Sequence, residues 1–221
     1  MDDPVAVWRE ALGDETHPRH RLAWTLFPES MVADAAARRL EAHKDEVIPL
    51  LLEILDTPDL YDEESLGGGF APIHAVELLG HWGVVAAAPR LLKIIEEKDE
   101  DATVYDRATV ALTRMGPAIL EDVLALAGRA APAKRPAIAE VLAAAGQGDS
   151  RAYGWIEARF DEARDEWGRV YMAEMLLQAD PARAIPYLEA RIKAFRGPYR
   201  ARAENLIRRA RERIAPPPAD K

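Results

Sequence analysis

The chain of 221 residues contains no cysteine and no long apolar run. The lack of cysteine excludes disulfides, thiolate metal sites and cysteine nucleophiles, and nothing ties the protein to an oxidising compartment. No apolar stretch approaches the length of a membrane span, and residues 1–4 show neither the basic nor the apolar region of a signal peptide. We therefore expect a cytoplasmic protein.

Positive charge is scarce overall and unevenly distributed. The net charge of −9 repels nucleic acid and anionic lipid unless basic residues gather in one place. Residues 41–106 hold sixteen acidic and four basic side chains, a balance of −12, whereas residues 181–215 hold ten basic and three acidic, a balance of +7. The acidic stretch favours a basic partner. The arginine-rich end favours an acidic partner or phosphate, or it is simply the polar outer face of a capping helix.

The β-branched and aromatic runs that mark strands are also missing, and Ala, Leu, Glu and Arg dominate. Apolar positions recur at intervals of three and four in segments separated by proline and glycine, which predicts one-sided helices throughout. One class of segment recurs at 72–83, 106–116, 135–146 and, more loosely, 169–180. The ends of these segments, at 83, 116, 146 and 180, are 33, 30 and 34 residues apart, which indicates a repeat.

A second class of segment follows each of these turns and carries a proline, namely Pro49, Pro89, Pro117 or Pro186. Proline fits the first turn of a helix, where its missing amide has no partner within the helix, so each proline predicts a helix start. Glycine after one helix and proline at the start of the next are typical of a tight helical hairpin.

Two-helix repeats of this length bury their apolar stripes only by stacking on one another. The sequence therefore predicts an all-α protein, an α-solenoid of about five antiparallel helical hairpins. We expect an irregular helical region at 1–30, the solenoid at 31–214 and a disordered tail at 215–221. The expected hairpins lie near 31–55, 70–97, 101–128, 133–162 and 165–195, with a closing helix near 199–214.

The period breaks at residues 56–69, an acidic and glycine-rich stretch. An inserted loop in a repeat array commonly lies on a binding face. A solvated linker without a task is the alternative interpretation.

The repeats resemble the bacterial HEAT-like repeats of the phycobilisome-lyase type. The resemblance is carried by Ala75-Val76-Glu77-Leu78-Leu79-Gly80 followed by Ala87-Ala88-Pro89-Arg90-Leu91-Leu92, and it extends in weaker form over residues 31–214. It implies a HEAT-like α-solenoid. Members of this group include chromophore lyases, scaffolds, regulators and DNA glycosylases, so the resemblance by itself selects no function.

The residues that combine into a metal-ligand pattern are His74, Glu77 and His81, which share one helix face. A structural histidine is the more frequent outcome for His74, which lies among apolar residues, and we expect neither a metal nor a cofactor. No nucleophile elbow or phosphate-binding loop is present. A binding role is therefore preferred over an enzymatic one.

The second helix of each hairpin lines the inner surface of an α-solenoid, so we expect partner contacts at the exposed positions of these helices. Tyrosine and arginine there are typical of interface hot spots. The predicted partner-binding residues are Arg90, Lys93, Glu97, Glu121, Asp122, Tyr153, Glu157, Arg183, Tyr187 and Arg191.

Three functions remain open from the sequence. The preferred one is a non-enzymatic protein-interaction module or scaffold with a protein partner. The first alternative is a lyase-like or chaperone-like binder of a small apolar or tetrapyrrole ligand. The second is a HEAT-like DNA-binding protein that uses the basic C-terminal end, which the overall negative charge disfavours.

Overall fold

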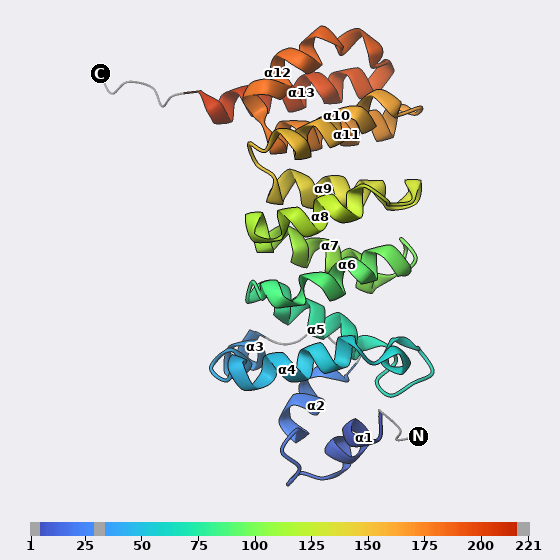
Figure 1. Cartoon of the computed structure of the whole chain (residues 1–221), viewed down its shortest axis with the longest axis vertical. Coiled ribbons are helices and arrows are strands. Elements are labelled where there is room, and N and C mark those ends of the chain that lie inside the picture. The colour runs from blue at the N-terminus through green and yellow to red at the C-terminus, as the bar shows by residue number, and fades with distance from the viewer. Residues whose placement is uncertain (1–4, 29–33, 216–221) are drawn as a thin grey trace, which may run out of the picture. The chain divides into compact units, whose positions relative to one another are not determined.

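The protein is all-helical in a computed structural model that describes residues 5–28 and 34–215. Within these residues there are thirteen α-helices, five short 3₁₀ helices and no strand, as predicted (Figure 1). The α-helices are α1 (Ala6–Gly13), α2 (His20–Leu26), α3 (Asp34–Glu41), α4 (Lys44–Leu55), α5 (Phe70–His81), α6 (Ala88–Glu97), α7 (Thr103–Met115), α8 (Leu120–Ala127), α9 (Arg135–Ala145), α10 (Ser150–Glu162), α11 (Glu166–Ala179), α12 (Pro181–Ala190) and α13 (Gly197–Ile214).

The chain divides into two compact units, residues 1–115 and residues 116–221. In the first unit α1 packs on α2, α2 on α5, α3 on α4, and α4 on α5, while α5 and α6 both pack on α7. Its core is built from large side chains with no exposed surface, among them Trp8, Leu51, Leu79, Leu91 and Leu112. These side chains come from α1, α4, α5, α6 and α7, so each of these helices contributes to the apolar core of the unit.

The second unit repeats a simple packing pattern. Helix α8 packs on α9, α9 on α10 and α11, α10 on α11, and both α12 and α13 pack on α11 and on each other. Leu142, Ile156 and Leu176 are fully buried between them. Packing between neighbours along the chain is what short paired helices require, because none of them can bury its apolar stripe alone.

Two turn glycines end their helices as the sequence predicted. Gly83, just after α5, has φ +61° and Gly116, just after α7, has φ +62°, in the left-handed region that side chains with a Cβ disfavour. The other two predicted ends also hold, since α9 ends at Ala145 and α11 at Ala179. The repeat spacing therefore located the helix ends correctly.

The prediction that every recurring proline marks a helix start is wrong in two cases. Pro89 occupies the first turn of α6, as predicted, and Pro117 lies in the 3₁₀ turn Gly116–Ile119 that leads into α8. Pro49 and Pro186, however, lie inside α4 and α12. Both are exposed, so water can satisfy the backbone carbonyl that each leaves without an amide partner four residues earlier.

The N-terminal region, where an irregular helical segment was expected, contains the two short helices α1 and α2. Of the tail predicted to be disordered, residues 216–221 lie outside the described residues. None of the helices within the described ranges is both long enough and apolar enough to cross a membrane.

Candidate functional site

The predicted partner-binding residues of the first unit are engaged in ion pairs. Arg90 donates from Nε and Nη2 to the two carboxylate oxygens of Asp56 at 2.8 and 2.7 Å, and this hydrogen-bonded carboxylate raises the pKa of Arg90. On the same helix, Lys93 lies 3.8 Å from Glu97 one turn later. All three side chains therefore have a partner of opposite charge within their own unit.

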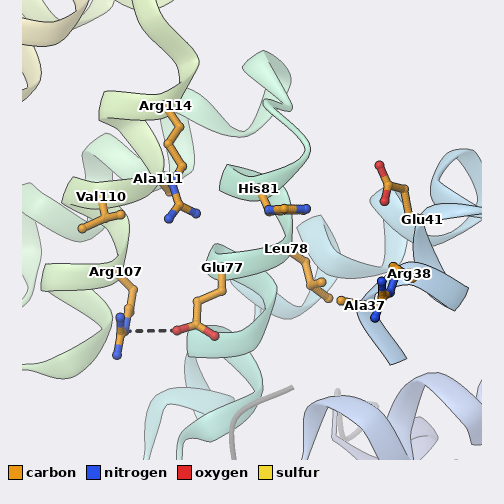
Figure 2. Close-up of a pocket in the computed structure, with 10 residues that line it drawn as sticks. All are labelled: Ala37, Arg38, Glu41, Glu77, Leu78, His81, Arg107, Val110, Ala111 and Arg114. Carbon is orange, nitrogen blue, oxygen red and sulfur yellow. Dashed lines mark ion pairs between the residues drawn. The ribbon is translucent and has the colours of Figure 1, made fainter. Parts of the chain in front are cut away.

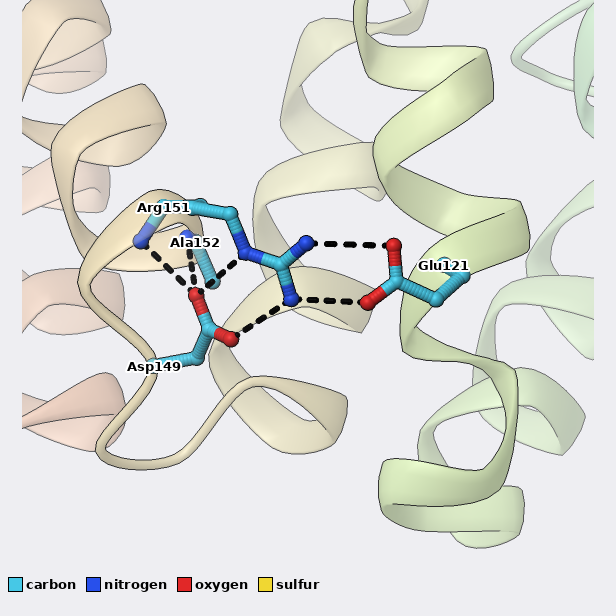
Figure 3. Close-up of polar contacts among 4 residues, drawn as sticks. All are labelled: Glu121, Asp149, Arg151 and Ala152. Carbon is cyan, nitrogen blue, oxygen red and sulfur yellow. Dashed lines mark hydrogen bonds and ion pairs between the residues drawn. The ribbon is translucent and has the colours of Figure 1, made fainter.

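Arg151, at the start of α10, forms ion pairs with two acidic residues of the second unit (Figure 3). Its Nη1 and Nη2 donate to the Glu121 carboxylate at 3.1 and 2.7 Å, and Nη2 also donates to Asp149 at 2.9 Å. Asp149 in turn accepts the backbone amides of Arg151 and Ala152 as the N-cap of α10. The Arg151 side chain and these amides lower the pKa of Asp149 to about 2. Of the predicted pair on α8, Glu121 is thus engaged, and Asp122 is exposed.

The exposure predicted for Tyr153 is wrong. Its side chain is 1% exposed, because the guanidinium of Arg183 lies 3.8 Å from the centre of its ring and helix packing covers the remainder. Burial, reinforced by the nearby carboxylate of Glu157, raises the pKa of Tyr153 to about 12. Arg183 completes the group by donating to Glu157 at 3.0 Å.

A similar group lies one turn further along α10 and α12. The Tyr187 hydroxyl donates to Asp161 at 2.9 Å, and the Arg191 guanidinium lies 3.6 Å from the same carboxylate and 3.7 Å from the Tyr187 ring centre. Burial and the hydrogen bond to Asp161 raise the pKa of Tyr187. The acidic residues of α10 thus bind the basic and aromatic residues of α12. The polar groups on this face therefore have partners within the same unit.

The three residues of the metal-ligand pattern point to different partners. His74 is 2% exposed and its Nδ1 lies 2.7 Å from the backbone oxygen of Leu26, at the end of α2. Glu77 pairs with Arg107 at 3.1 Å, and His81 is exposed. No three His, Asp or Glu side chains of the described residues are placed to hold a metal ion. The contact of His74 with the Leu26 backbone oxygen instead links α5 to α2.

The loop at residues 56–69 is partly embedded in the first unit. Leu60 is fully buried, and the Tyr61 hydroxyl donates to the backbone oxygen of Leu55 at 3.0 Å. Lys98, from the end of α6, lies 4.2 Å from the centre of the Tyr61 ring. Burial, with nearby carboxylates, raises the pKa of Tyr61. The loop is therefore a structural part of the unit. Its exposed positions are Asp56, Pro58, Asp59 and the acidic residues 62–64.

Most arginines of the basic C-terminal helix are neutralised locally. Arg200 donates to Glu204 and Arg208 to Glu212, each at 3.0 Å and one turn apart along α13. The acceptors of two further arginines come from α11 and α12, since Arg202 pairs with Glu174 and Arg211 with Glu189. Pairing with carboxylates removes much of the positive field that phosphate binding would need.

A cleft of about 500 Å³ opens on the first unit between α3, α5 and α7 (Figure 2). Its volume lies within the range of ligand-binding pockets. The residues that line it are Ala37, Arg38, Glu41, Glu77, Leu78, His81, Arg107, Val110, Ala111 and Arg114. The cleft therefore combines an apolar floor with a rim of mostly basic side chains.

The basic rim of this cleft is only partly neutralised. Arg107 is held by Glu77, whereas Arg38 and Arg114 are exposed and form no ion pair with any described residue. Figure 2 shows Arg114 reaching from α7 beside Ala111 and His81 projecting from α5 toward α3. In this cleft the exposed Arg38 and Arg114 adjoin exposed apolar surface at Val110.

The sequence interpretation missed this cleft because it assigned partner contacts to the second helix of each hairpin. One signal was present, since Arg107 and Arg114 are seven residues apart and so lie on one face of a helix. Their position opposite Glu77 and His81 is decided by the packing of α7 on α5, which the spacing within one helix does not contain.

The fold and the cleft define an all-helical protein with an open cleft lined by three helices of its N-terminal unit. Comparison of the chain with protein-family models, with curated proteins and with solved structures finds no match.

Proposed function

We propose that this chain is a non-catalytic binding protein built from HEAT-like helical hairpins, and that a protein partner docks in the cleft between α3, α5 and α7. The observation that carries the proposal is the cleft itself, where Arg38 and Arg114 form no ion pair with a described residue and lie beside the partly exposed Val110. Interfaces are enriched in arginine and need desolvated apolar surface at their centre.

The repeat architecture is supported by ion pairs between residues about one repeat apart. Asp56 and Arg90 are separated by 34 residues, and Glu121 and Arg151 by 30. Glu157 and Arg183 follow with a separation of 26. In a stack of similar hairpins, residues at equivalent positions of neighbouring repeats lie side by side, which produces this spacing.

The internal pairing of α6, α8, α10 and α12 argues against the face that the sequence favoured. A partner that bound Arg183 or Arg191 would have to displace Glu157 or Asp161 first. Exchanging one exposed ion pair for another gains little free energy, because each such pair contributes about 0–1 kcal/mol. A partner that bound Arg38 or Arg114 in the cleft would displace no carboxylate of the residues that the structure describes.

Site-specific photo-crosslinking tests the proposal with two matched valines. Val110 lies in the cleft and is 38% exposed, whereas Val85 lies in the same unit outside the cleft and is 41% exposed. Each is replaced in turn by a photo-reactive phenylalanine analogue, and the full chain is irradiated in extract of its source cells. We expect a discrete crosslinked protein from position 110 and none from position 85. Identical products at both positions, or none at 110, would contradict the proposal.

A further inference from the structure

We infer that the cleft between α3, α5 and α7 recognises a protein segment that presents an acidic side chain next to an apolar one. This inference rests on the proposed function and names the chemistry of the partner. Arg38, Arg114 and Val110 carry the argument.

The acidic group of the partner is inferred from the two free arginines. In the same unit, Arg90 pairs with Asp56 and Arg107 with Glu77. Arg38 and Arg114 are exposed on the rim without an ion pair to any described residue. A guanidinium presents several N–H donors in a planar fork that matches a carboxylate, so each of the two is suited to bind Asp or Glu from outside.

The apolar group is inferred from the floor between these arginines. Leu78 and Ala111 form the buried base of the cleft, and Val110 leaves 38% of its surface exposed beside them. Covering such a surface with an aliphatic side chain removes it from water. A partner that supplied charge alone would leave this area solvated.

The net charge of the surrounding unit limits how many acidic residues the partner segment can carry. Residues 1–115 hold 23 acidic and 11 basic side chains, a net charge of −12, so a long acidic segment is repelled before it reaches the cleft. The rim residue Glu41 adds to this repulsion locally. The cleft thus favours one or two acidic residues in an apolar setting over an acidic tract or a nucleic acid.

A phage-displayed library of short random peptides, selected on the immobilised full chain, tests this chemistry directly. We expect the enriched sequences to share an Asp or Glu adjacent to Leu, Ile, Val or Phe. Synthetic copies are then measured by fluorescence anisotropy at about 0.15 M ionic strength, where long-range fields are screened. Replacing the acidic residue of the peptide by its amide should weaken binding about tenfold or more.

Charge reversal in the protein supplies the matched comparison. The double variant Arg38→Glu with Arg114→Glu should lose about tenfold or more in affinity for the same peptides. The control variant Arg39→Glu with Arg209→Glu makes the same change in net charge at two exposed arginines that do not line the cleft, and its affinity should stay within about twofold. Circular dichroism of both variants verifies that each remains helical.

Enriched peptides without an acidic residue, equal losses in both double variants, or no enrichment at all would overturn the inference. The crosslinking experiment at Val110 distinguishes a wrong partner chemistry from a wrong proposed function. A partner captured at 110 and not at 85, together with peptides that need no acid, retains the binding function and refutes only its chemistry.

Discussion

Gly80 lies at a close contact between α5 and α7. A Cβ at this position would come within 2.4 Å of the Ala111 Cβ, so Gly80→Ala forces the two helices apart. We expect a loss of about 1–3 kcal/mol in the free energy of unfolding, despite the better helix propensity of alanine. Urea denaturation followed by circular dichroism measures it. Gly154→Ala is the control, because nothing lies within 4 Å of its added Cβ in α10, and it should stabilise by up to about 1 kcal/mol.

The lowered pKa of Asp149 predicts how the stability contributed by this single residue depends on pH. The ordinary pKa of an aspartate is about 3.9, and in the folded chain that of Asp149 is lowered to about 2 by its bonds to Arg151 and to the α10 amides. A lowered pKa stabilises the fold above the unfolded value, and this stabilisation is lost as the pH falls toward the folded value. Asp149→Asn should therefore destabilise at about pH 5, and the difference from wild type should shrink as the pH falls below about 4. Thermal unfolding of both proteins across this range measures it, and a constant difference would contradict the assignment.

The burial of single residues is not always predictable from the sequence. Helical spacing placed Tyr153 on an exposed face, yet the residue is buried because Arg183 of α12 covers its ring. A spacing rule states which residues share a face of one helix. It does not state which neighbouring helix covers that face.

At the scale of elements, the attachment of α2 to α5 depends on His74. Replacing His74 by Leu removes the contact with the Leu26 backbone oxygen at 2.7 Å and leaves that carbonyl without its side-chain partner. An unsatisfied buried acceptor costs about 1–3 kcal/mol, so we expect α2 to detach more readily. Hydrogen exchange by mass spectrometry should show faster exchange at residues 20–27, with little change in α9 and α11.

His81→Leu serves as the comparison for this effect. His81 is exposed at the end of α5 and forms no such bond to α2, so its replacement should leave exchange at residues 20–27 unchanged. Faster exchange in both variants would indicate a general loss of α5 rather than the loss of one attachment.

The helices themselves were largely predictable, because their ends carry local signals. Gly83 and Gly116 adopt the left-handed conformation that ends a helix, and Pro89 occupies the first turn of α6. Pro49 and Pro186 were misleading, since an exposed position in the second turn of a helix tolerates proline when water satisfies the freed carbonyl. Local signals therefore predict how many helices there are and where they lie better than they predict the residue at which each helix begins.

At the scale of the whole molecule, the division at residues 115 and 116 predicts two units of cooperative unfolding. Hydrogen exchange in increasing denaturant should show α5 and α7 opening together, and α9 and α11 opening together at a different denaturant concentration. Gly80→Ala should shift only the first of these transitions, because its clash lies within residues 1–115. One common transition for all four helices, shifted as a whole by the variant, would show that the chain unfolds as a single unit.

The sequence by itself determined the helical class and the placement of most helices, because apolar periodicity, glycine at helix ends and proline near helix starts act over a few residues. It did not determine which side chains are free to bind. Helix packing joined Asp56 to Arg90 and Glu157 to Arg183, and it placed Arg38 and Arg114 around a cleft without an ion pair to any residue the structure describes. These outcomes depend on contacts between residues about a repeat apart or further, so only the tertiary structure decided which side chains surround the cleft.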